Sequence, residues 1–293
     1  MDLTVASRYF EHLTVEDVAF LAEIGGLEVE RLRAQPRLVL ELLSRGEVFE
    51  TVFGSPGRRG QPPTGQLDPL RVSPFLIFAV AVARAETELG QAAFVDDWFG
   101  PRRRVAVFDA PALRELLADP AVRLFLAQLL ASYTHVASGS VWVQRRGGWR
   151  RQRFSELDPV RLAALLEVLP EAERPGVYRR LGDLALFLTG VFPDYAASRA
   201  LSPLDQVRLR RTAASGPTSR VERPDELSGL QLWEELGRRW YELAWRTAPV
   251  PSDPLEMVAR VGRHFPETRR ILNFVTDRWL FPLRERWFPL TGA

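Results

Sequence analysis

The sequence predicts an all-α, mainly helical fold with one short β-hairpin near residues 140–154. Three observations lead to this prediction. Five of the Ser-Pro and Asp-Pro dipeptides precede helical apolar spacing and are typical of helix starts, apolar residues recur behind them every three or four positions, and strand signals are few. The length of 293 residues and the apolar content of 46% allow a substantial core.

The helix starts can be recognised by their capping chemistry. The Ser or Asp side chain accepts hydrogen bonds from free N–H groups of the first turn, and Pro loses nothing there because its nitrogen would be unbonded. The five signals are Ser73-Pro74, Asp119-Pro120, Asp158-Pro159, Ser202-Pro203 and Asp253-Pro254. Behind them the spacing is helical; between residues 175 and 191, one face carries Val177, Leu181, Leu184, Leu188 and Val191.

The N-terminal third predicts four short helices, at residues 15–24, 28–34, 37–44 and 47–53. The longest apolar run, Phe75 to Ala83, has nine residues, whereas a bilayer-spanning helix needs about 20. We therefore expect a buried helix there and no membrane partner. Residues 1–13 contain four charged or histidine side chains and no apolar signal region, so we expect a cytoplasmic protein.

Composition divides the chain into sections. We predict an acidic N-terminal helical section at 1–53, a flexible linker or loop at 54–69, a central helical section with a basic hairpin at 70–214, and a Trp-rich helical section at 226–293. Residues 54–69 are rich in Gly and Pro, and a second such stretch covers residues 215–225. The alternative is that all sections form one compact domain.

The hairpin is the most informative local feature. Residues 140–144 and 149–154 flank two glycines, Gly147 and Gly148, which permit a tight turn. Planar guanidinium groups pair well with phosphate oxygens, and Trp stacks on bases. The candidate nucleic-acid-binding residues are Arg145, Arg146, Trp149, Arg150, Arg151 and Arg153, together with Arg102, Arg103 and Arg104 on a preceding segment. In that segment, residues 104–108 predict one short strand.

This interpretation has an alternative. The hairpin arginines can pair with acidic neighbours while Trp142 and Trp149 cap the core. Many DNA-binding proteins place a helix in a groove of the duplex. The helix that precedes the hairpin, residues 122–134, is apolar like a core helix and does not suit this role.

Charge is unevenly distributed along the chain. All 39 basic residues are Arg, and the net charge is only +2. Residues 1–56 hold ten acids and five Arg, a net of −5, whereas residues 101–154 hold ten Arg and three acids, a net of +7. Either the acidic section covers the basic one, or the basic section is an anion-binding surface. Smaller clusters, at 102–104, at 208–211 and at Arg269-Arg270, are each expected to be a solvated helix or loop edge.

Several chemistries are excluded by residues that the chain lacks. Without Cys there is no disulfide, thiolate nucleophile or Cys-ligated zinc, and without Lys there is no Schiff base or P-loop Lys. The three histidines, His12, His135 and His264, have no metal-ligand spacing. We therefore expect no metal and no cofactor.

Three hypotheses about function follow. The leading one is a non-catalytic protein that binds an anionic partner, DNA or RNA, through the Arg-rich hairpin. The second is a scaffold or oligomer subunit that docks another protein or a second copy through Trp279, Trp287 and Phe288. The third is an enzyme that uses dispersed groups, with candidates Asp96, Asp97, Asp183 and His135; an intrahelical pair with Arg179 or Arg180 is the simpler role for Asp183.

Overall fold

The structure, a computed structural model, describes residues 2–54, 72–100, 102–145, 148–198, 201–214 and 228–280. The side chains of residues 2–3, 141, 143–150 and 152 lie outside the described part. The predicted linker at 54–69, from residue 55 onward, and the stretch at 215–225 also lie outside the described residues.

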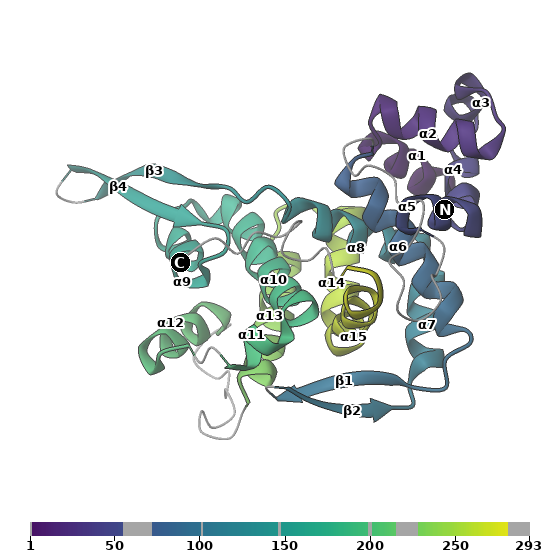
Figure 1. Ribbon diagram of the computed structural model, residues 1–293. Helices are drawn as coiled ribbons and strands as arrows, with labels where there is room; N and C mark the ends of the chain where they lie inside the picture. Colours follow the sequence, from purple (N-terminus) through teal and green to yellow (C-terminus); the bar gives the residue numbers. More distant parts are fainter. Residues whose placement is uncertain are drawn as a thin grey trace. The chain divides into compact units, whose positions relative to one another are not determined.

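The described chain is mainly helical and has two small antiparallel sheets, which confirms the predicted fold class (Figure 1). It divides into two compact units, and each is described by itself. The first comprises Met1–Phe94, Phe108–Thr134 and Phe274–Ala293, and the second comprises Val95–Val107 and His135–Asn273. Across the described residues, every helix is too short or too polar to cross a bilayer.

The described residues of the first unit form eight helices and one π-helical turn. They are α1 (Asp2–His12), α2 (Val15–Gly25), α3 (Val29–Ala34), α4 (Arg37–Leu43), α5 (Gly46–Phe53), α6 (Pro74–Leu89), α7 (Ala110–Ala118) and α8 (Pro120–Ser132), followed late in the chain by the π-helical turn η3 (Thr276–Leu280). The four short helices predicted after residue 14 are confirmed within one or two residues, whereas α1 was not predicted.

Helix α6 is the centre of the first unit. It packs on α5, α7 and α8, and the run predicted to be a buried helix is buried on every face. The buried carboxylate of Asp17 accepts a hydrogen bond from the amide of Ser73 at 2.7 Å and another from the amide of Thr14 at 2.9 Å. One side chain thus joins the starts of α2 and α6.

The second unit holds both sheets and the remaining helices. Strand β1 (Val95–Gly100) pairs with β2 (Arg103–Val107), and β3 (Ser138–Arg145) pairs with β4 (Gly148–Ser155). The helices are α9 (Pro159–Ala163), η1 (Ala164–Glu167), η2 (Glu171–Glu173), α10 (Arg174–Val191), α11 (Pro193–Ser198), α12 (Pro203–Ala213), α13 (Gly229–Arg246), α14 (Asp253–Arg263) and α15 (Phe265–Val275). Strand β1 was not predicted, because Asp96 and Asp97 interrupt its apolar pattern.

All five helix-start signals coincide with helices. Pro occupies the first turn of α6, α8, α9, α12 and α14. Four of the preceding side chains accept a hydrogen bond from the first turn, for example Asp119 from the amide of Ala121 at 2.8 Å. In α14 the helix includes Asp253, and Ser252 precedes it without a side-chain cap.

The core of the second unit is the packing of α10 on α13. Gly182 of α10 lies against the ring of Tyr241, where any β-carbon would overlap the ring atoms. The Tyr241 hydroxyl donates to the carboxylate of Asp183 at 2.9 Å, and Arg179 lies 3.8 Å from the other carboxylate oxygen. Asp183 therefore has the intrahelical partner expected from the sequence and an additional partner on α13.

Burial raises the pKa of Asp183, an effect that the nearby Arg179 and the Tyr241 hydrogen bond only partly offset. The folded state therefore retains this proton at pH values where the unfolded chain, with an Asp pKa of about 4, has released it. The contribution of Asp183 to the free energy of unfolding is therefore fully present below about pH 4, and it decreases as the pH rises toward the raised pKa.

We predict that Asp183→Asn removes this loss, because the amide is neutral at every pH and its oxygen still accepts from Tyr241. Thermal unfolding from pH 4 to pH 8 should show a gain in melting temperature over the native chain that grows with pH. Glu171→Gln, at a carboxylate that is 90% exposed, is the matched control and should show no such trend. A gain that is the same at every pH would contradict the prediction.

Candidate nucleic-acid interface

The predicted hairpin is present and longer than expected. Strands β3 and β4 pair in continuous register from Ser138 opposite Ser155 to Arg145 opposite Gly148. The ribbon is anchored by contacts of β4 with α9 and η1, and it extends away from these helices (Figure 1). Pairing of the two strands satisfies the backbone groups that face each other. Of the described side chains, those of Trp142, Arg151 and Arg153 are exposed.

One face of the hairpin combines an exposed aromatic ring with arginine. The register places Trp142 directly opposite Arg151, and Ser140 opposite Arg153. The side chain of Trp142 is 64% exposed, and both arginines are exposed. The Nε of Arg151 donates to the hydroxyl of Ser140 at 2.6 Å, which holds its guanidinium on the face that carries Trp142.

Glu156, at the base of the hairpin, is the first acidic residue after β4. Glu156 accepts a hydrogen bond from Arg180 at 2.9 Å and one from the backbone amide of Ala137 at 3.0 Å. This carboxylate therefore closes the hairpin and holds it to α10. Residues 138–155 themselves contain five Arg and no acid.

The other predicted hairpin residues are placed only in part. Arg145, Trp149 and Arg150 occupy strand positions, and their side chains lie outside the described part of the structure. Arg146 lies outside the described residues. By register, position 149 shares a face with positions 142, 151 and 153.

Arg102, Arg103 and Arg104 lie on the other ribbon. Arg102 has a positive φ of 54° in the β1–β2 turn, and its amide donates to Asp194 of α11 at 2.8 Å. The guanidiniums of Arg103 and Arg104 lie over the rings of Phe99 and Trp98, at 4.6 and 4.0 Å from the ring centroids. Figure 1 shows the two ribbons at different places of the second unit, so these arginines do not extend the hairpin surface.

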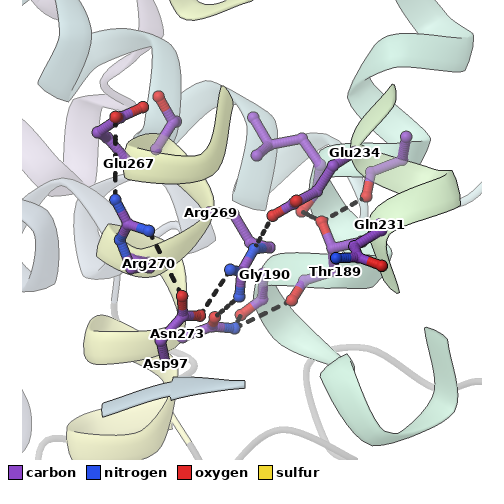
Figure 2. Close-up of polar contacts among 12 residues, drawn as sticks. Asp97, Thr189, Gly190, Gln231, Glu234, Glu267, Arg269, Arg270 and Asn273 are labelled. Atoms are coloured by element: carbon purple, nitrogen blue, oxygen red, sulfur yellow. Dashed lines mark hydrogen bonds and ion pairs between the residues drawn. The ribbon is translucent and has the colours of Figure 1, made fainter. Parts of the chain in front are cut away.

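A buried ionic network holds β1 in the second unit (Figure 2). Arg269 of α15 is only 3% exposed; its Nη2 donates to Asp97 at 2.6 Å, and its Nε donates to Glu234 of α13 at 2.5 Å. Its Nη1 donates to Asn273 at 2.9 Å. Every guanidinium nitrogen of Arg269 is therefore used within the protein, and the network has a structural role.

Asn273, the single Asn of the chain, extends the network to α10. Its amide group donates to the carbonyls of Thr189 at 3.0 Å and Gly190 at 2.7 Å. These carbonyls belong to the last turn of α10 and have no partner within that helix. Asn273 thus satisfies a helix end that would otherwise be buried without hydrogen bonds.

The expectation that Arg269-Arg270 form a solvated helix edge is therefore wrong. Arg269 is buried, and Arg270 contacts Asp97 at 3.4 Å. The apolar spacing of α15 is the sequence signal for the burial of Arg269. Buried Phe265 lies four residues before it and buried Leu272 three residues after it, so all three share one helix face. Sequence alone does not show that Asp97 and Glu234, two acids from other elements, neutralise the charge of Arg269 within this apolar stripe.

The residues named for the enzyme hypothesis occupy separate surroundings. Asp96 and His135 are exposed, Asp97 belongs to the ionic network, and Asp183 contacts Tyr241. Each buried carboxylate has its own set of partners. Among the described residues, no group of three His, Asp or Glu side chains is arranged to bind a metal.

The aromatic C-terminus is described as far as Leu280. The Trp279 ring contacts Phe49 at a centroid distance of 5.4 Å and Phe274 at 6.0 Å, all within the first unit. Trp279 therefore packs on its own chain. Trp287 and Phe288 lie outside the described residues.

Comparisons with known proteins do not add a function. No family model matches the sequence, and no curated protein and no solved structure is significantly similar. Function must therefore be inferred from the chemistry of the surfaces.

We predict that Arg269→Met destabilises the protein by about 3–5 kcal/mol, because Asp97 and Glu234 lose a buried cation. Urea unfolding of the two chains gives the difference. Arg239→Met is the matched control: Arg239 pairs with Glu242 at the surface, and its loss should cost about 0–1 kcal/mol. Equal losses in the two variants would show that the network contributes no more than a surface pair.

Proposed function

We propose that this protein is a non-catalytic binding protein whose β3–β4 hairpin contacts single-stranded nucleic acid. The observation that carries the proposal is the pairing of exposed Trp142 with Arg151 and Arg153 on one face of a projecting ribbon. Such a face offers a ring that can stack on a base and cations that can pair with phosphate.

Charge favours an anionic partner. Five Arg and no acid fall within residues 138–155, and the nearest following carboxylate, Glu156, is held at the base by Arg180. Guanidinium groups are charged at every physiological pH and present donors in a fork that matches phosphate oxygens. A polyanion that contacts several of them at once gains affinity through counterion release.

Stacking favours a single strand over a duplex. A large aromatic side chain that is 64% exposed on a projecting ribbon has an open face for an unpaired base. In a duplex the base faces are stacked on one another, and such a ring reaches only base edges and backbone. With Arg151 across the strand, the ring and the guanidinium offer a base contact and a phosphate contact at adjacent positions.

The surroundings of this face fit positioning better than catalysis. Its described side chains are hydroxyls, two guanidiniums and an indole, none of which is a general base near neutral pH, and no carboxylate lies on the hairpin. The binding expected from such a face depends on backbone and base planes, so it should show little sequence preference.

We predict that the native chain binds a labelled oligothymidine in fluorescence anisotropy at low salt and that Trp142→Ala weakens binding about tenfold or more, because one base loses its stacking platform. Arg151→Gln with Arg153→Gln should weaken binding and reduce the slope of log affinity against log salt by about 1.4, or about 0.7 for each phosphate contact on a single strand.

The control removes equal charge elsewhere: Arg31→Gln with Arg33→Gln, both exposed on α3 of the first unit. It should leave the affinity close to that of the native chain. Absence of binding at low salt, or equal loss in the α3 variant, would contradict the hairpin as the binding surface. Tighter binding to a duplex of the same length would contradict the preference for a single strand.

A further inference from the structure

An open cleft lies between α13 and α14 of the second unit, and none of its lining residues belongs to the hairpin. It has a volume of about 680 Å³, within the range of roughly 300–1,000 Å³ that is typical of small-molecule sites. It is lined by Arg238, Glu242, Trp245, Glu256, Ala259, Gly262 and Arg263.

The cleft follows from two matched helical stripes. Residues 238, 242 and 245 of α13 are spaced by four and three positions, and residues 256, 259 and 263 of α14 by three and four, so each set shares one helix face. Arg238 and Trp245 are seven positions apart, which corresponds to about 10 Å of helix. Ala259 and Gly262 are small, which leaves room between the stripes.

The two ends of the cleft differ in chemistry. The helices are joined by a short connection and run antiparallel, and a β-carbon at Gly262 would lie 3.7 Å from the carbonyl oxygen of Arg238. Arg238 and Arg263 therefore lie at one end, and half-buried Trp245 lies at the other with Glu256.

The arginines at this end are not neutralised by the acids of the cleft. Arg238 and Arg263 are exposed, and neither has an ion pair with a described residue. Glu242, in the middle, already pairs with Arg239 at 3.1 Å and Arg246 at 3.3 Å, both outside the lining. Two cations thus face one end of the cleft, while carboxylates at the middle and far end disfavour a second anionic group there.

We propose that this cleft binds a small ligand with one anionic group and a flat ring that carries an amino group, the chemistry of a nucleoside monophosphate. Arg238 and Arg263 hold the anion through charge-assisted hydrogen bonds. Trp245 stacks on the ring. Glu256 accepts a hydrogen bond from the amino group. The site is independent of the hairpin and of its proposed function.

Isothermal titration of the full chain with AMP at low salt tests the proposal. We expect saturable binding of one AMP per chain, weakened about tenfold or more by Arg238→Gln with Arg263→Gln and to a similar extent by Trp245→Ala. Ala259→Phe, which fills the cleft and changes no charge, should abolish binding. Circular dichroism and the melting temperature establish that each variant is folded.

The control is again Arg31→Gln with Arg33→Gln, which removes the same charge from the first unit and should leave the affinity for AMP unchanged. Adenosine and inorganic phosphate should each bind more weakly than AMP. Absence of AMP binding, an equal effect of the control, or full retention of affinity in Ala259→Phe would overturn the proposal. Phosphate binding as tight as AMP would also overturn it, because the ring would then contribute nothing.

Discussion

The second unit depends on the close approach of three helices around the ring of Tyr241. Gly182 of α10 and Gly262 of α14 both lie against this residue, and Gly237 of α13 faces Phe265 at the start of α15. Side chains at these positions would separate the helices, because a packed interior does not accommodate added atoms without displacement. The glycines thus set the spacing of the helices, and the shape of the cleft between α13 and α14 depends on this spacing.

The same packing determines which polar groups are buried and what they require. Tyr241 brings its hydroxyl into the core, where Asp183 accepts its hydrogen bond. Arg269 enters the same unit on α15, and Asp97 and Glu234 neutralise it from two other elements. Buried ion pairs add little net stability, but an unpaired charge there is costly. The network therefore specifies how β1 and α15 are placed more than it strengthens the fold.

Arginine serves three different purposes in this lysine-free chain. Some guanidiniums are consumed inside the protein, as in Arg269, and others lie on their own aromatic neighbours, as in Arg103 and Arg104. A third group is exposed to solvent, on the hairpin beside Trp142 and in the cleft at the end opposite Trp245. Exposed guanidiniums of this group keep donors that an anionic ligand can reach, which is why both proposals rest on them.

Most of the local structure follows from short stretches of sequence. Capping residues before Pro, helical apolar spacing and the glycines at 147–148 each act within a few residues, so the helix starts and the hairpin were predictable. The pairing of Trp142 with Arg151 was not predicted and is given by the register of the folded hairpin. Tertiary structure alone decided the burial of Arg269, the pairing of β1 and the cleft between α13 and α14, because these depend on which distant residues meet. Asp97 and Arg269 are 172 positions apart, and no local pattern encodes their contact.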